Sequence, residues 1–263
     1  MELRGKRVLV TGASRGIGRA LASHFADAGA KVALVARDRV ALEELADALG
    51  GTAHPADLLD PEQLERLIHR VEDEAGAVDV LVNNAGVLYP GPLWEHSPEQ
   101  LAAQVRLNLA APLELCRQAI PRMLRRGGGH LVNVASLAGL ASVSGMSTYS
   151  ATKAGLCQGG AALRDELKGL PIGVTTVMVG GVPTDLLEHG AEYAPFAKGF
   201  ARLRRIQLVP DTSADDLGAA VVRGVVQGKH TVFLPRRAFP FVAAVEAPRK
   251  IIRLALLGVK RRA

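Results

Sequence analysis

Short apolar segments alternate with longer amphipathic ones along most of the chain. The short segments are rich in β-branched residues, which predicts buried strands, whereas the longer ones repeat their apolar positions at helical spacing. We predict strands at 7–11, 31–36, 52–54, 78–82, 130–135, 172–178 and 231–234. Helices are predicted at 16–28, 39–49, 61–75, 98–125, 149–168 and 213–227. This alternation is typical of repeated strand–helix–strand units with a parallel sheet.

The predicted fold class is α/β: a three-layer Rossmann fold, with a doubly wound parallel sheet of about seven strands and helices on both faces. We assign 1–235 to one dinucleotide-binding catalytic domain and 236–263 to a C-terminal tail. Turn-rich stretches at 86–97 and 184–212 follow predicted strands at their carboxyl ends. Open α/β sheets bind their ligands at that edge, so we expect the functional site there.

Composition excludes several classes of protein. Hydrophobic residues make up 48% of the chain, which does not fit a disordered protein. Cys116 and Cys157 fall within predicted helices without a partner spacing, so we predict neither a metal site nor a disulfide, and a reducing, cytoplasmic location. The first apolar run is cut short by Thr11 and Gly12, so it predicts neither a signal peptide nor a membrane span.

The net charge of +6 is concentrated at one end of the chain. From Arg236 onward there are eight basic residues and one acid, Glu246, so the tail carries +7 and the rest −1. The body of the protein is therefore nearly neutral, and we expect no nucleic-acid partner.

The tail has the pattern of a basic amphipathic helix. Between Pro248 and Arg262, basic residues gather on one side of a helical wheel and apolar residues spread over the other, and Phe239 and Phe241 precede them. Such a segment predicts peripheral contact with an anionic membrane surface. Packing on a sister subunit or over the chain's own active site is an equally open alternative.

A glycine-containing turn follows the first predicted strand and reads Thr11-Gly12-Ala13-Ser14-Arg15-Gly16-Ile17-Gly18. Gly12 can form the tight turn, Gly16 lets the backbone approach a phosphate, and Gly18 permits close packing of helix and strand. The N-terminus of the following helix presents free N–H groups to a pyrophosphate. The turn therefore predicts a dinucleotide site, although a plain strand-to-helix turn is the alternative.

The pattern Thr-Gly-x-x-x-Gly-x-Gly resembles the cofactor turn of the short-chain dehydrogenase/reductase family. Three further motifs of that family follow in its order: Asn83-Asn84-Ala85-Gly86, Ser136, and Tyr149-Ser150-Ala151-Thr152-Lys153. The resemblance spans roughly 5–234. It implies an oxidoreductase that assembles as a homodimer or homotetramer through the helices at 98–125 and 149–168.

The resemblance also implies how the cofactor is held. Asp57 and Leu58 match the family's adenine contact, although Asp57 is equally explained as a turn residue near Pro61. Val182 and Thr184 match contacts to the nicotinamide half. The implied cofactor-binding set is Gly12, Ser14, Arg15, Gly16, Ile17, Gly18, Arg37, Asp57, Leu58, Asn84, Ala85, Gly86, Tyr149, Lys153, Val182 and Thr184.

One motif departs from the family. Where Pro-Gly-x-x-x-Thr is usual, this chain reads Val179-Gly180-Gly181-Val182-Pro183-Thr184, so the leading proline is absent and a second glycine follows. A looser turn results, because glycine adds backbone freedom. We expect a different substrate loop and retained catalysis.

The end of the second predicted strand bears on cofactor preference. Ala36 occupies the position where an acid would bind the ribose 2′-hydroxyl of NAD. Arg37 follows it, and Arg15 can approach from the glycine turn, so two guanidinium groups are available for the 2′-phosphate of NADP. We therefore predict NADP(H), with NAD less favoured but kept open by Asp38.

Tyr149 and Lys153 are four residues apart and share one face of a helix. A free tyrosine has a pKa of about 10, and we expect the Lys153 ammonium and an oxidised nicotinamide to lower it. Tyr149 would then give its proton to the developing alkoxide, while Lys153 also holds the nicotinamide ribose. The resemblance assigns the substrate carbonyl to Ser136 and a water relay to Asn108, which completes the catalytic set.

The segment from 184 to 210 is predicted to close as a lid over an apolar ligand. Its apolar residues are Leu186, Leu187, Tyr193, Phe196, Phe200, Leu203 and Ile206. Leu88, Tyr89 and Trp94 are predicted to line the opposite wall. The expected substrate is a hydrophobic ketone or secondary alcohol of steroid, retinoid, fatty-acyl or aromatic type.

Two other functions compete with this prediction. A non-catalytic nucleotide-sensing or scaffold protein would use the same fold, but would not need a proton donor such as Tyr149. A sugar-nucleotide epimerase or dehydratase uses related chemistry, but adds a substrate domain for which the residues after 234 leave no room.

Overall fold

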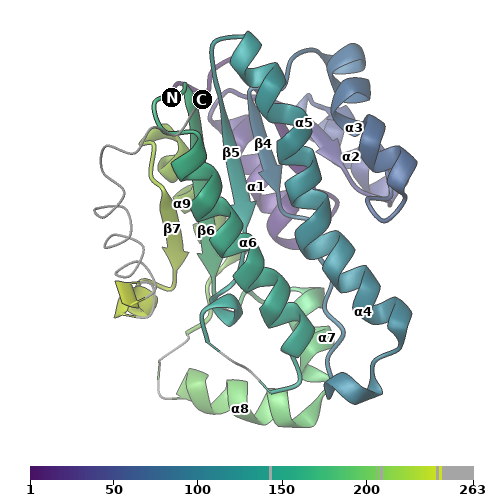
Figure 1. Cartoon of the computed structure of the whole chain (residues 1–263), viewed down its shortest axis with the longest axis vertical. Helices are drawn as coiled ribbons and strands as arrows, with labels where there is room; N and C mark the ends of the chain where they lie inside the picture. The colour runs from purple at the N-terminus through teal and green to yellow at the C-terminus, as the bar shows by residue number, and fades with distance from the viewer. Residues whose placement is uncertain (142–143, 206, 208–209, 241–242, 245–263) are drawn as a thin grey trace.

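The computed structural model describes residues 1–141, 144–205, 207, 210–240 and 243–244. Within these residues, seven strands form one parallel sheet in the order β3-β2-β1-β4-β5-β6-β7 (Figure 1). The strands are β1 (Arg7–Thr11), β2 (Lys31–Val35), β3 (Thr52–Ala53), β4 (Val80–Asn83), β5 (Gly129–Val134), β6 (Ile172–Val179) and β7 (Thr231–Leu234). The order changes direction between β1 and β4, which places a ligand crevice beyond the carboxyl ends of these two strands.

The sheet is covered by helices on both faces, as the sequence predicted. These helices are α1 (Gly16–Asp27), α2 (Arg39–Leu49), α3 (Pro61–Ala75), α4 (Pro98–Val105), α5 (Ala111–Arg125), α6 (Ser147–Glu166), α7 (Asp185–Ala191), α8 (Ala194–Arg205) and α9 (Ala214–Val226). α1, α2 and α9 pack against one face of the strands, whereas α3 and α5 pack against the other. Apolar side chains fill both interfaces, so the strands are buried on both sides.

The predicted helix at 98–125 is continuous but not uniform. Its middle, Arg106–Ala110, is a single π-helical turn, η2, between α4 and α5. Such turns insert one extra residue into an α-helix and frequently occur at functional sites. Periodicity alone did not reveal it, because the apolar stripe continues across the turn.

The stretch at 184–212 contains two helices, α7 and α8, that the sequence did not predict. Pro183 stands before α7 and Pro195 lies in the first turn of α8, and both are positions at which a helix tolerates proline. Figure 1 shows both helices beyond the carboxyl ends of β5, β6 and β7.

A buried histidine near the start of β5 is held in its neutral form. The Nε2 atom of His130 lies 2.8 Å from Thr175 Oγ1, and that hydroxyl donates to the carbonyl oxygen of Lys229 at 2.6 Å. Thr175 therefore accepts a hydrogen bond from the Nε2–H of His130, which leaves Nδ1 unprotonated against the backbone of Gly173. Burial lowers the pKa of His130 to about 4.

We expect this histidine to destabilise the fold in acid. The unfolded chain binds a proton near the ordinary pKa and the folded chain only near 4, so stability falls as the pH drops from 6.5 toward 4. A full shift of this size corresponds to roughly 3 kcal/mol. Urea unfolding at both ends of that range should show a smaller loss for His130→Gln than for the wild type. The exposed His69→Gln is the control, and identical losses in all three proteins would contradict the assignment.

Candidate active site

The predicted catalytic side chains come together at the carboxyl edge of the sheet. Ser136 follows β5, Asn108 lies in η2, and Tyr149 and Lys153 lie on the first turns of α6. The Lys153 ammonium is 5.7 Å from the centre of the Tyr149 ring, as the four-residue spacing predicted. All four residues are buried.

The electrostatics of Tyr149 are governed by burial. Burial raises the pKa of Tyr149 to about 12, and a hydrogen bond with Ser136 opposes this only in part. Burial also lowers the pKa of Lys153 to about 8. The Lys153 ammonium donates to the carbonyl oxygen of Val134 at 2.9 Å. In this conformation burial of the phenol therefore dominates the pKa of Tyr149. The predicted fall, which depends on an oxidised nicotinamide beside Lys153, stays a prediction.

Ser136 is fixed by the backbone around it. Its hydroxyl accepts from the amide of Ala138 at 3.1 Å and donates to the carbonyl oxygen of Val179 at 3.3 Å. The first contact caps the short 3₁₀ turn η3 (Leu137–Gly139). The hydroxyl is thus held between β5 and β6, on the side of Tyr149.

Asn108 joins the π-helical turn to the loop after β4. Its Oδ1 accepts from the amide of Val87 and its Nδ2 donates to the carbonyl oxygen of the same residue, both at 2.8 Å. Nδ2 also lies 3.3 Å from the hydroxyl of Thr152, which neighbours Lys153. Asn108 therefore positions the loop that carries Gly86, beside Lys153.

The glycine turn packs directly on the motif that follows β4. Asn84 donates from Nδ2 to the carbonyl oxygens of Thr11 and Gly12, at 3.0 and 3.2 Å. The hydroxyl of Thr11 accepts from the amides of Asn84 and Ala85. Thr11 stands first in the turn motif but is not among the residues predicted to bind the cofactor.

Gly18 is required by this packing. A Cβ atom at Gly18 would lie 2.0 Å from the carbonyl oxygen of Gly12 and 2.6 Å from Nδ2 of Asn84. Only a residue without a side chain allows α1 to begin this close to the turn. The sequence prediction for Gly18 gives the same reason.

The N-terminus of α1 fits an anionic group. Its cap residue, Arg15, makes no side-chain hydrogen bond to the first turn, and that turn contains no acidic residue. By contrast, Asp38, Asp60 and Ser97 cap α2, α3 and α4 with their side chains. The first N–H groups of α1 are therefore available to a pyrophosphate between Ser14 and Ile17.

The residues predicted to select the cofactor lie at the tip of β2. Arg37 is exposed beside the half-buried Ala36. One oxygen of Asp38 accepts from the amide of Ala41 at 3.1 Å, so this carboxylate serves as a helix cap. Arg15 forms an ion pair with Asp185 of α7 at 2.6 Å, which joins the glycine turn to the lid.

Two further predicted cofactor contacts lie after β3. Asp57 accepts from the amide of Leu59 at 2.9 Å, while Asp60 caps α3. Asp57 is thus a turn residue whose second oxygen is not used in that contact. The side chain of Leu58 is buried against the core, so only its backbone faces outward.

The loop after β6 returns to the glycine turn. Thr184 stands at the N-terminus of α7, and its hydroxyl donates to the carbonyl oxygen of Val182 at 3.2 Å. A Cβ atom at Gly16 would lie 3.2 Å from Cγ2 of Thr184. The structure therefore brings Val182 and Thr184 beside the turn, despite the missing proline.

An apolar lid covers Tyr149. Its ring belongs to a cluster with the predicted lid and wall residues Leu88, Leu186, Leu187, Tyr193, Phe196 and Phe200, together with Met146 and Ala138. Tyr89 lies edge-on to His189 of α7. The lid is therefore closed over the phenol in this conformation.

Two glycines let the lid approach so closely. A Cβ atom at Gly181 would lie 2.3 Å from Cζ of Phe200, and one at Gly145 would lie 2.3 Å from Cδ1 of Tyr193. Gly181 is the extra glycine of the departing motif. The structure thus gives that departure a local reason: an aromatic ring of α8 occupies the space of the absent side chain.

Several predicted residues of the substrate pocket and of the tail need correction or lie outside the described residues. Trp94 does not line the pocket, because the 3₁₀ turn η1 (Leu93–Glu95) turns it outward and leaves it 85% exposed. Leu203 lies on α8 but not in the lid cluster. Ile206, Phe241 and the tail segment Pro248–Arg262 lie outside the described residues.

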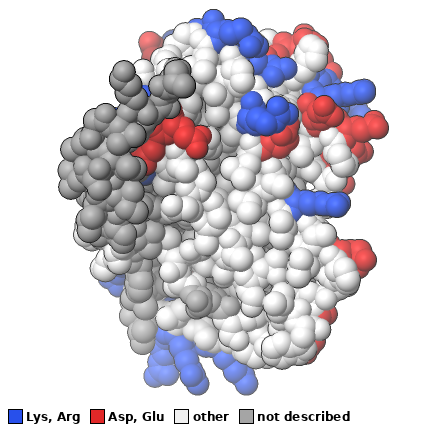
Figure 2. All heavy atoms as spheres, viewed as in Figure 1, with Lys and Arg blue, Asp and Glu red and all other residues white. Residues whose placement is uncertain are grey.

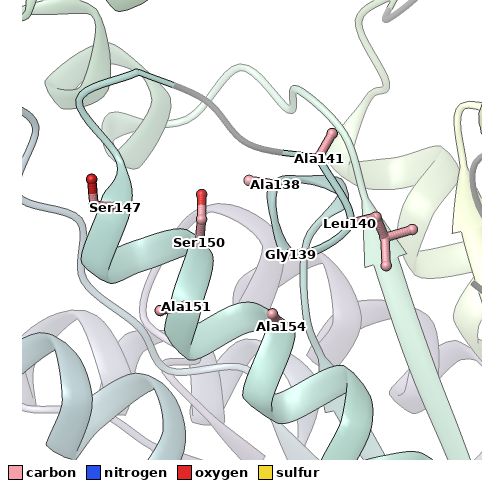
Figure 3. A pocket seen from close by; sticks show the side chains of 8 residues that line it. All are labelled: Ala138, Gly139, Leu140, Ala141, Ser147, Ser150, Ala151 and Ala154. Carbon is pink, nitrogen blue, oxygen red and sulfur yellow. The ribbon is translucent and has the colours of Figure 1, made fainter.

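A separate hollow of about 410 Å³ lies between η3 and the first turns of α6 (Figure 3). It is lined by Ala138, Gly139, Leu140, Ala141, Ser147, Ser150, Ala151 and Ala154. In the close-up the side chains of Ser147 and Ser150 point the same way, above Ala151 and Ala154. Because neither Tyr149 nor Lys153 lines it, this hollow is distinct from the covered catalytic centre.

Comparison with known proteins decides the family. The family model described as short chain dehydrogenase matches residues 6–193. The chain belongs to the short-chain dehydrogenase family. Among relatives of this short-chain dehydrogenase, a fatty acyl-CoA reductase of Mycobacterium tuberculosis is 34% identical over 262 residues, which cover 89% of this chain and 88% of that protein. A ketoacyl reductase of a Nostoc species is 40% identical over 185 residues, which cover 68% of this chain and 64% of that protein.

Solved short-chain dehydrogenases share the fold along nearly the whole chain. One from Sphingobium yanoikuyae, in complex with NADPH, has a TM-score of 0.81 and 28% identity and covers 97% of this chain and 98% of its own. One from Burkholderia phymatum, in complex with NAD, has a TM-score of 0.80 and 26% identity, and the match covers 97% of this chain and 96% of that one. This short-chain dehydrogenase is therefore an oxidoreductase with a nicotinamide-binding fold.

No helix within the described residues is both long and apolar enough to cross a bilayer. They also contain no cluster of histidine, cysteine and acidic side chains that could hold a metal ion.

Proposed function

We propose that this protein uses NADPH to reduce a hydrophobic ketone to its secondary alcohol, and that the ketone is of fatty-acyl type. The observation that carries this proposal is the convergence of Ser136, Tyr149 and Lys153 beneath an apolar lid, beside the glycine turn. The fatty acyl-CoA and ketoacyl reductases among the relatives favour an acyl chain over a steroid, retinoid or aromatic ketone.

Each side chain has a separate task in the proposed reaction. A bound nicotinamide supplies the hydride. The hydroxyl of Ser136 donates to the substrate carbonyl and polarises it. Tyr149 gives its phenolic proton to the developing alkoxide, and its raised pKa keeps that proton in place beforehand. Lys153, released from Val134, holds the ribose and carries the charge that stabilises the phenolate afterwards.

Substrate entry requires the lid to open. The cluster that buries Tyr149 is formed largely by side chains of α7 and α8, so these helices must move before a carbonyl can reach the phenol. Once open, the same aromatic and aliphatic side chains form an apolar wall. An acyl chain would replace the contacts that the lid makes with itself.

The preference for NADPH rests on the tip of β2. Asp38 is committed to capping α2, and the neutral Ala36 offers no acceptor to a ribose hydroxyl. Arg37 remains exposed at the place where a 2′-phosphate would lie, and Arg15 can join it by leaving Asp185. An exposed ion pair of this kind contributes about 0–1 kcal/mol, so a phosphate can displace it.

Substitution of Arg37 tests this preference. We expect Arg37→Ala to raise the KM for NADPH by about tenfold or more, since hydrogen bonds to charged groups contribute on the order of 1.5–3 kcal/mol, and to leave the KM for NADH unchanged. Arg39→Ala, which removes a neighbouring guanidinium paired with Glu43, is the matched control. Equal use of both cofactors by the wild type would overturn the NADP assignment.

We further propose that two copies associate through α4, α5 and α6. On α4 and α5 the apolar side chains of Leu101, Val105 and Leu113 are exposed. Leu109 lies on the same stripe, at four-residue spacing, and packs against Gly155 of α6. A continuous apolar stripe on neighbouring helices is typical of a homo-oligomer interface.

For the tail after 235 we propose contact with an anionic membrane surface. The support is its charge of +7 and its amphipathic pattern. Arg236 and Arg237, where the segment begins, are exposed at the end of β7.

A further inference from the structure

The charged residues of α8 are all basic. Its sequence contains no acid, and Lys198, Arg202 and Arg205 recur at helical spacing on the side opposite Phe196 and Phe200. Figure 2 shows basic side chains along the lower edge of the molecule, where α8 lies in Figure 1. One helix thus covers the catalytic tyrosine with one side and presents cations to the surroundings with the other.

These three cations have no partner within the described part of the chain. Arg204, on the same helix, forms an ion pair with Asp211, but no carboxylate among the described residues pairs with Lys198, Arg202 or Arg205. Uncompensated cations on a short helix repel one another. The helix dipole favours Arg202 and Arg205 in the last turn, and an external anion would offset the remaining repulsion among the three cations.

Large apolar side chains are exposed at both ends of α8. At its N-terminal end, Leu93 and Trp94 are 46% and 85% exposed. Their loop is joined to the helix through Gly91, whose amide donates to the carbonyl oxygen of Gly145, against which Tyr193 packs.

At the C-terminal end, Phe239 is 61% exposed. Arg237 connects it to the helix by donating to the carbonyl oxygen of Gln207. We call the surface formed by Leu93, Trp94, Lys198, Arg202, Arg205 and Phe239 the lid face.

We propose that the lid face docks on an anionic membrane surface. Cations attract phospholipid headgroups, while Trp94, Leu93 and Phe239 can enter the interfacial layer, where amphipathic aromatic rings are favoured. A soluble anion would account for the cations but not for apolar side chains on both sides of them. Phe239 itself belongs to the basic tail, whose first residues, Arg236 and Arg237, are exposed.

This docking would direct the substrate to the active site. The lid helices lie between the lid face and Tyr149, so their opening would connect the catalytic pocket to the membrane surface. A water-insoluble ketone could then pass from the bilayer to the phenol without crossing water. This second step rests on the proposed function, whereas docking itself does not.

Vesicle co-sedimentation of the full chain tests the docking. The vesicles contain equal amounts of phosphatidylcholine and phosphatidylglycerol, with pure phosphatidylcholine for comparison. The test variants are the triple change Lys198→Glu, Arg202→Glu and Arg205→Glu, and the single change Trp94→Ser. The control is the triple change Lys31→Glu, Arg66→Glu and Arg125→Glu, which alters the charge equally at exposed residues elsewhere.

We expect the wild type and the control to bind anionic vesicles and the α8 triple variant to bind at least about a hundredfold more weakly, because each Lys or Arg near such a surface contributes about fivefold. Trp94→Ser should weaken binding by a smaller factor. Equal binding of the wild type and the α8 variant, as tail-only anchoring would give, overturns the proposal. A wild type that stays in the supernatant also overturns the proposal. This holds even if the α8 variant shows a raised KM for a phosphate-bearing thioester, since the cations would then bind a soluble anion and not a membrane.

A second readout separates this proposal from the proposed function. The α8 variant should reduce a small water-soluble ketone at the wild-type rate but show a raised KM for a ketone embedded in the vesicles. If the wild type reduced neither the soluble nor the embedded ketone, the reductase assignment would be contradicted. Sedimentation would still test docking by itself.

Discussion

Tyr149→Phe is expected to reduce the kcat for ketone reduction by about two to four orders of magnitude, the contribution of a positioned general acid. The substitution removes only the hydroxyl. The ring remains in the lid cluster, so folding should be unchanged. NADPH consumption under saturating substrate measures the effect, and thermal unfolding confirms that the variant is folded.

Tyr193→Phe is the matched control, because it removes a hydroxyl from the same cluster without touching the proposed proton path. It should retain nearly full kcat. If Tyr149→Phe matched the wild type, the proton would come from elsewhere. If the wild type bound NADPH but reduced no carbonyl compound, the non-catalytic alternative would gain support.

Gly18→Ala should produce the second large effect. The new methyl group would lie 2.0 Å from the carbonyl oxygen of Gly12, so α1 must move away from the turn. Forcing an extra methyl into a packed site costs about 1–3 kcal/mol. We also expect NADPH affinity to fall by at least about tenfold, since the N–H groups at the start of α1 would no longer face the turn.

Fluorescence titration with NADPH and urea unfolding measure the two consequences of Gly18→Ala. Gly199→Ala provides the control, because a Cβ at that position of α8 meets no other atom within 4 Å. This control should be neutral or stabilising, as alanine is favoured over glycine inside a helix. Wild-type affinity in Gly18→Ala would show that the turn does not hold the cofactor.

The sheet and the helices around it were predictable because their signals are local and repeated. Each buried strand is a short β-branched run, and every strand except β3 packs between long amphipathic helices. The π-helical turn at Asn108 was not predictable in this way. It changes the backbone by one residue without interrupting the apolar stripe, so the spacing of apolar positions does not indicate it.

The candidate site was predictable as a set of residues but not as an environment. Ser136, Tyr149 and Lys153 could be assigned because they stand in ordered motifs. The direction of the Tyr149 pKa shift in this conformation could not, because it depends on burial by side chains some forty to fifty positions later in the chain. Trp94 shows the same limit: its hydrophobic character predicted a pocket wall, whereas its place in η1 turns it outward.

Phe200 packs on Gly181 and Tyr193 packs on Gly145. The cover of the catalytic site therefore has a different structural origin from the reacting groups below it. The reacting groups belong to α6 and the sheet. The position of the lid above them depends on the absence of a side chain at Gly145 and Gly181. A single methyl group at either position would push a ring outward and enlarge the room for the ligand, with the proton donor unaltered. Substrate range and bond chemistry can therefore diverge independently in this scaffold.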